Sequence, residues 1–268
     1  AEAAHGIAGG TLPAVAVMEQ ALDAIRRREA ELNAFVYVAP EQELLLAAAA
    51  IDAEIRAGRA CGPLGGIPIA VKDLLAVAGM PNTASSPVLA DRVETKDASS
   101  IRALKTAGAI ITGKTQTHEF ALGVTTPQSR NPWDNTRNPG GSSGGSAIAV
   151  ATGMSLGAMA TDTRASVRVP AALCGIVGYK SSHGRVPLTG CHPLSFCFDT
   201  IGPLANSVAC CATADSVMAG DWDGLVPERP LRGLRLAVLK DFVLDGLAPQ
   251  VDRLEQRRYR HFLHWKTA

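Results

Sequence analysis

Apolar side chains recur every three or four residues near the start of the chain, a spacing typical of an amphipathic helix packed on a core. The recurrence from Val15 to Ile25 predicts one such helix, starting near Thr11 and Pro13 and ending at Asn33. A second helix is predicted over residues 40–58, because acidic residues in its first turn precede a body rich in alanine and leucine.

Short apolar runs bounded by glycine or polar residues predict buried strands after these helices. The run Ile67–Val71 predicts a strand that ends at Lys72 and Asp73. Further strands are predicted over residues 110–112, 156–161 and 234–239. Further helices are predicted over residues 101–107, over a small-residue stretch ending at 152, and over 207–218. The first of these helices is expected to be capped by Ser99 or Ser100. The alternation of helix and strand, without a detectable repeat, predicts an α/β fold.

Composition fits a globular protein of one domain, or at most two, because 47% of the 268 residues are hydrophobic and 19% are charged. The formal net charge is +1, with no long block of one sign, so nucleic acid and anionic membranes are not expected partners. No run approaches the ~18 apolar residues of a membrane span, and the N-terminus lacks the order of a signal peptide. We therefore expect a cytoplasmic protein that acts on a small molecule.

The six cysteines are few for the length, and none forms the C-x-x-C spacing typical of zinc or redox sites. We expect them to be small buried hydrophobes, and expect neither a metal nor another cofactor. Cys174 as a nucleophile is the weaker alternative, because no motif surrounds it. The cysteines are Cys61, Cys174, Cys191, Cys197, Cys210 and Cys211.

Three features have the residue types of a catalytic site: Lys72 after an apolar strand, the glycine–serine cluster 140–146, and Ser166. The cluster matches the G-x-S-x-G elbow, with Ser143 as the nucleophile, but the preceding Arg137–Gly140 is no strand. It also lacks the lysine that follows the last glycine of a phosphate-binding loop. No serine lies three residues before a lysine, which excludes the S-x-x-K arrangement. What remains is one amine and two hydroxyls on separate loops.

These segments resemble the amidase signature family in three ordered blocks, Gly65–Asp73, Gly140–Ala147 and Asp162–Lys180. Residues 32–36 and 199–204 resemble the family too, and the similarity runs from about residue 7 to about 247. The resemblance implies a mixed open sheet covered by helices on both faces. It also implies an amidohydrolase that cleaves a small linear amide to a carboxylate and ammonia or an amine through an acyl-enzyme.

By the same resemblance, Lys72 is the base, Ser142 the relay that follows an unusual cis peptide bond, and Ser166 the nucleophile. Burial at the end of its strand is expected to lower the pKa of Lys72, so that its neutral form accepts a proton. The backbone N–H groups of Thr163, Arg164, Ala165 and Ser166 are the implied oxyanion donors. The sequence assigns no substrate-binding residue and implies no metal.

The sequence departs from the family at the oxyanion turn, which is glycine-rich in relatives and contains Arg164-Ala165 here. Arg164 either pairs with an acidic substrate or points outward into solvent. A related alternative is an amidotransferase A-type subunit, but that branch resembles R-Q-P where this chain has Arg168-Val169-Pro170. The hydrolase is therefore favoured.

Family members usually extend well beyond this length, so residues 1–249 are expected to be an amidase core that is incomplete at its C-terminal end. Residues 250–268 form an atypical basic and aromatic tail. An incomplete sheet exposes edges and apolar faces, so we expect a homo-oligomer or other self-association and low activity. An inactive amidase-like fragment is the alternative from another class.

Overall fold

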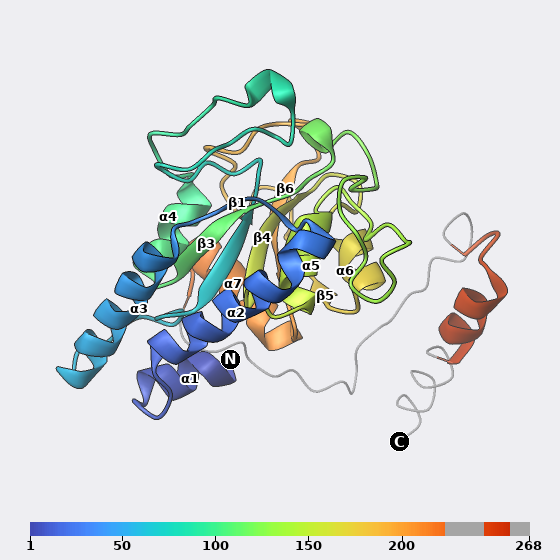
Figure 1. Ribbon diagram of the computed structural model, residues 1–268. Helices are drawn as coiled ribbons and strands as arrows, with labels where there is room; N and C mark the ends of the chain where they lie inside the picture. Colours follow the sequence, from blue (N-terminus) through green and yellow to red (C-terminus); the bar gives the residue numbers. More distant parts are fainter. Residues whose placement is uncertain (223–243, 258–268) are drawn as a thin grey trace. The chain divides into compact units, whose positions relative to one another are not determined.

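The computed structural model of the protein describes residues 1–222 and 244–257 (Figure 1). Contacts divide the chain into two units, Ala1–Leu225 and Val226–Ala268. In the second unit, residues 249–257 form a helix, which includes the beginning of the predicted tail. The strand predicted over 234–239 and the tail from residue 258 onward lie outside the described residues.

The first unit contains a six-stranded mixed sheet with the strand order β1-β3-β2-β4-β6-β5. Its strands are β1 (Phe35–Val38), β2 (Pro68–Lys72), β3 (Ile110–Thr115), β4 (Gly157–Asp162), β5 (Val177–Gly178) and β6 (Thr200–Ala205). The central strand β2 runs parallel to β3 and β4, whereas the pairs β1/β3, β4/β6 and β5/β6 are antiparallel. The predicted α/β class and mixed sheet are confirmed.

Helices cover this sheet on two faces, as Figure 1 shows for α5 and α7. The helices are α1 (Glu2–Ala8), α2 (Ala14–Leu32), α3 (Glu41–Arg56), α4 (Ser99–Thr106), α5 (Gly144–Ala151), α6 (Arg168–Cys174) and α7 (Val208–Ala219). Ile69, Val71 and Met159 pack in a cluster with α4 and α7. Ala70 and Ala158 belong to a second cluster with α5 and α6. Successive strand residues therefore face different cores, because side chains alternate across a strand.

Helix α2 begins at Ala14 after the N-cap Pro13, close to the predicted start, but its capping contact was not predicted. The first turn of α2 is capped from α3, since the Asp52 carboxylate accepts hydrogen bonds from the amides of Ala14 and Val15, at 2.6 and 3.1 Å. Thr11 instead donates to the Gly6 carbonyl. The prediction that Ser99 or Ser100 caps α4 was wrong, because both lie inside the helix and its N-cap is Ala98.

The cysteines are less uniformly buried than predicted. Cys174 and Cys211 are buried, but Cys197 is exposed, and Cys61, Cys191 and Cys210 are partly exposed. Burial raises the pKa of Cys174 to about 12, and its thiol contacts the Pro139 carbonyl at 3.6 Å. Both observations favour the structural interpretation of Cys174 over a nucleophile. Among the described residues, no helix is long and apolar enough to cross a membrane.

Candidate active site

Polar side chains gather where two neighbouring parallel strands end. Lys72 is the last residue of β2, and Thr161 and Asp162 are the last two of β4. The two strands pair in parallel, with Val71 opposite Met159. Their carboxyl ends therefore meet at one edge of the sheet, where the Lys72 amine donates a hydrogen bond to the Thr161 hydroxyl at 2.9 Å.

The Lys72 amine is fully buried and lies 2.8 Å from the Ser142 hydroxyl. Burial lowers the pKa of this amine to about 7, because removal from water disfavours the charged form. Cys191, Asp162 and Asp199 act in the opposite direction without cancelling the effect. A large fraction of Lys72 is therefore neutral near pH 7, which a proton-accepting lysine requires.

Glycines allow the loop before α5 to fold against other backbone segments. The peptide bond between Gly141 and Ser142 is cis. A Cβ atom on Gly141 would lie 2.0 Å from the Thr125 carbonyl oxygen, and one on Gly145 would lie 2.2 Å from that of Ala34. Only glycine fits at these two positions, so the glycines set the backbone path that delivers Ser142.

Thr126 organises the same loop from outside it. Its hydroxyl donates to the Gly140 carbonyl at 2.9 Å and accepts from the Gly144 amide at 3.0 Å. The carbonyl of Ser142 accepts from the His118 amide at 2.9 Å. These bonds fix the loop on both sides of Ser142, so the serine hydroxyl is held toward Lys72.

Ser143 does not have the surroundings of a nucleophile elbow. Residues 137–141 form no strand, whereas the elbow places its serine on a strand-to-helix turn. The Ser143 side chain is buried, and its hydroxyl donates to the Thr161 carbonyl at 3.3 Å. The structure thus gives Ser143 a structural role at the start of α5.

The turn between β4 and α6 is wound around the Asp162 carboxylate. This carboxylate accepts from the amides of Ala165 at 2.7 Å and Val167 at 3.1 Å. The Arg168 guanidinium binds both of its oxygens, at 3.0 and 3.1 Å. Burial alone would raise the pKa of Asp162, but Arg168 and the amides stabilise the anion, and the net result is a lowered pKa.

Ala165 adopts a backbone conformation that favours glycine, with φ at 110°. Its amide is engaged by Asp162, so it is not a free oxyanion donor as the sequence suggested. The amides of Thr163, Arg164 and Ser166 have no acceptor among the residues that the structure describes. The predicted set of donors is thereby reduced to three.

Ser166 begins the approach to α6 and is 7% exposed. Its segment meets the glycine–serine loop through the backbone, since the Ser143 amide donates to the Ser166 carbonyl at 3.2 Å. Within the described part of the chain, no hydrogen bond joins the Ser166 hydroxyl to that of Ser142. The structure therefore links Lys72 to Ser142 directly and brings Ser166 to the neighbouring segment.

Asp199 ties a second loop to the turn between β4 and α6, which is called the oxyanion turn below for its proposed role. Its carboxylate accepts from the Thr163 hydroxyl, and also from the amides of Leu194 and Ser195 at 2.8 and 2.9 Å. The segment 194–199 is thus anchored beside the turn that contains Ser166.

A second buried amine lies near the site but is paired. Lys114 on β3 forms a fully buried ion pair with Asp73 at 2.9 Å. The same amine donates to the Pro81 carbonyl at 2.7 Å and to the Asn82 side chain at 3.1 Å. Burial lowers the pKa of Lys114, and Asp73 opposes that shift. Lys72 has no carboxylate within ion-pair distance among the described residues, which separates the roles of the two lysines.

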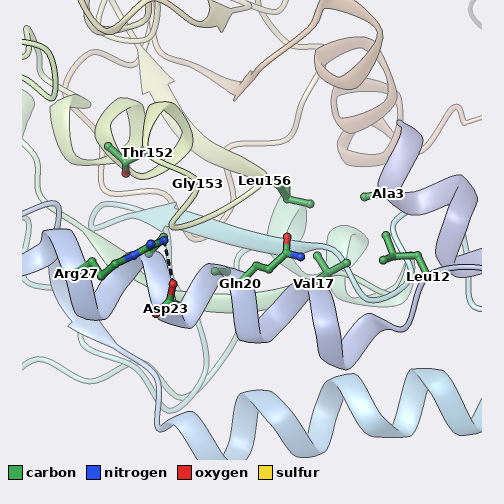
Figure 2. A pocket seen from close by; sticks show the side chains of 11 residues that line it. Ala3, Leu12, Val17, Gln20, Asp23, Arg27, Thr152, Gly153 and Leu156 are labelled. Carbon is green, nitrogen blue, oxygen red and sulfur yellow. Dashed lines mark ion pairs between the residues drawn. The ribbon is translucent and has the colours of Figure 1, made fainter.

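Two surface hollows lie away from these residues. Figure 2 shows the larger, of about 480 Å³, where Gln20 and Arg27 on α2 face the segment from Thr152 to Leu156. The smaller, of about 370 Å³, is lined largely by α1, the strands and α7. Neither is lined by Lys72, Ser142 or Ser166, so the candidate chemistry does not lie in either hollow. The described residues also contain no cluster of three His, Cys, Asp or Glu side chains that could hold a metal.

Sequence reasoning missed two hydroxyls, those of Thr161 and Thr126. Thr161 ends an apolar run beside Asp162, which is the same pattern that identified Lys72 and Asp73. A rule that collects polar residues at strand ends would have found it. Thr126 lies in a loop without any local signal, and its role depends on contacts 14 to 18 residues away.

Comparisons with known proteins show which sequences and structures this chain resembles. A sequence profile described as Amidase matches residues 16–261. The A-type subunit of the glutamyl-tRNA(Gln) amidotransferase of Rhodopirellula baltica is 40% identical over 262 residues, which covers 90% of this chain and 52% of that protein. The chain spans about half the length of the curated relatives it matches.

Solved structures show the same similarity. A crystal structure of an amidase is 37% identical, with a TM-score of 0.85, and the match covers 96% of this chain and 59% of that one. The peptide amidase of Stenotrophomonas maltophilia is 35% identical, with a TM-score of 0.76, and the match covers 84% of this chain and 50% of that one.

Proposed function

The chain belongs to the amidase family, and on that premise we propose that it hydrolyses small linear amides with Ser166 as nucleophile, Ser142 as relay and Lys72 as base. The observation that carries the proposal is the buried Lys72 amine, 2.8 Å from Ser142 and with a pKa lowered to about 7. A buried amine without a counter-ion does not stabilise the core. A buried base with a shifted pKa beside a hydroxyl is typical of a catalytic site.

In the proposed mechanism, neutral Lys72 keeps its N–H bond to Thr161. Its lone pair accepts the proton of the Ser142 hydroxyl, whose oxygen lies 2.8 Å away. Ser142 passes its proton to Lys72 as it takes the proton of Ser166, whose oxygen attacks the amide carbonyl. This step requires the Ser166 hydroxyl to turn onto Ser142 when substrate binds, since catalytic hydrogen bonds often tighten only in the complex.

The amides of Thr163, Arg164 and Ser166 would donate hydrogen bonds to the carbonyl oxygen as its negative charge develops. These amides have no other acceptor among the described residues, which supports this role. The relay then reverses and protonates the leaving nitrogen, which breaks the C–N bond and leaves an acyl group on Ser166. Water attacks the ester through the same relay, releasing the carboxylate and restoring the serine. The products are a carboxylic acid and ammonia or an amine.

An amidotransferase subunit is the second candidate, supported by the 40% identity to the subunit from Rhodopirellula baltica. Val169 is the difference from that branch in the turn after the nucleophile. Hydrolysis of small amides by the chain alone would favour the hydrolase. Labelling of the nucleophile without such hydrolysis would favour a subunit that needs a partner. Self-association and a cytoplasmic location remain predictions from the sequence.

The test is labelling by a serine-directed fluorophosphonate, mapped by mass spectrometry and combined with ammonia release from a panel of primary amides. We expect the label on Ser166, no label after Ser166→Ala, and loss of acylation in a folded Lys72→Ala protein. A label on Ser143 would instead support the elbow mechanism. Failure of the folded wild-type protein to react at Ser166 would contradict the assignment and support an inactive fragment.

A further inference from the structure

The oxyanion turn contains one cation that the described residues leave unpaired. Arg164 lies two residues before Ser166, is exposed, and forms no hydrogen bond or ion pair with the described residues. We propose that Arg164 binds an anionic group on the substrate, so that the amides turned over are those that also carry a carboxylate. This inference rests on the proposed function.

The carboxylate around which this turn is wound already has its full set of partners. Asp162 binds the guanidinium of Arg168 through both oxygens and also accepts from the amides of Ala165 and Val167. Because Arg168 binds both carboxylate oxygens, a second guanidinium could not make the same two-oxygen contact. Arg164 is therefore not held inward by the turn that contains it.

The other carboxylate beside the turn, that of Asp199, also has its full set of partners. Both oxygens of Asp199 are engaged, one by the Thr163 hydroxyl and one by the amides of Leu194 and Ser195. Asp199 is 4% exposed, so it offers Arg164 no accessible partner. The two anions next to the nucleophile are thus internally satisfied, and the uncompensated charge at the surface of the turn is positive.

The position of Arg164 couples this charge to the reaction. Its own amide is one of the three proposed oxyanion donors, so its side chain begins at the reacting centre. The guanidinium matches the planar, two-oxygen geometry of a carboxylate. An ω-carboxylated amide would place its amide at Ser166 and its carboxylate on Arg164, whereas a neutral amide would gain only the first contact.

The test measures binding and turnover separately. Affinities of succinamate, glutaramate and adipamate are compared with those of the neutral amides butyramide, valeramide and hexanamide, by calorimetry on the Ser166→Ala protein. We expect tighter binding of at least one anionic amide than of its neutral counterpart, with a preference that weakens as salt is added. Adding Arg164→Gln is expected to remove the preference, a loss of about 10- to 100-fold in affinity for a charge-assisted bond. Arg164→Lys should retain part of it.

Arg102→Gln is the matched control, because this exposed arginine lies on α4 away from the turn. The proposal is overturned if neutral and anionic amides bind equally, if neither binds, or if the preference survives Arg164→Gln. Turnover of the same amides by the protein with Ser166 intact tests the proposed function. Anion-selective binding without ammonia release would contradict the hydrolase assignment but support the binding role of Arg164.

Discussion

The lowered pKa of Lys72 makes folding stability depend on pH in a way that one substitution removes. The pKa is about 7 in the folded protein against a usual value of 10.5, so between these values the unfolded chain binds the proton and the folded protein does not. Stability therefore rises with pH across this window. Integrating the two titrations gives an increase of about 2 kcal/mol in the free energy of unfolding between pH ~7 and ~9.

Lys72→Met keeps a side chain of similar length without the titrating amine. We expect the wild-type free energy of unfolding, measured by urea denaturation, to gain about 2 kcal/mol more than that of Lys72→Met over this pH range. Other titrating groups affect both proteins and cancel in the difference. Lys96→Met, at an exposed lysine, should follow the wild type.

If Lys72 is the proposed base, the same pKa has a kinetic consequence, because only a neutral Lys72 could accept the proton of Ser142. The labelling rate of Ser166 should increase about tenfold for each pH unit below pH ~7 and level off above it. Parallel stability profiles for wild type and Lys72→Met would refute the shifted pKa. A labelling rate without an inflection near neutral pH would refute its role as base.

Two further substitutions test the backbone and the core. Ala165→Gly should raise the free energy of unfolding by about 1 kcal/mol, measured by urea denaturation, because it relieves a residue held at φ 110°; an unchanged or lower stability would contradict the strain. Lys114→Met should lower that free energy by about 3–5 kcal/mol, since it leaves the buried Asp73 carboxylate without its counter-ion. Lys105→Met, which breaks a partly exposed pair with Asp97, should cost no more than about 1 kcal/mol, and equal losses would show that burial is not the cause.

Local sequence signals predicted the elements that surround the site. The apolar run before Lys72 became β2, with bounds shifted by one residue, and the run ending at Thr161 became β4. Asn33 ends α2 in the left-handed conformation that its residue type favours. The small-residue helix predicted after the glycine–serine cluster is present, but it begins inside the cluster, at Gly144. These features depend on neighbours in the sequence, so the sequence alone contains them.

Short elements, and contacts that local residue types do not encode, were not predicted. The four-residue strand β1 and the two-residue strand β5 are too short to show a period. Helix α6 was missed because its first turn contains Pro170 and follows a polar turn that suggested a loop. The start of α2 depends on Asp52, which is 37 to 38 residues away in the sequence. The engagement of the Ala165 amide by Asp162 likewise follows from the turn geometry and not from residue types.

The strand order determines when this site can assemble during synthesis. Strand β2 is paired on one side by β3 and on the other by β4, and Thr161 is made 89 residues after Lys72. At common rates of translation this interval lasts on the order of ten seconds. For that time one edge of a central strand that is apolar up to Lys72 has no partner, and such edges recruit other strands. The nascent chain is therefore most vulnerable to aggregation just before Lys72 is enclosed.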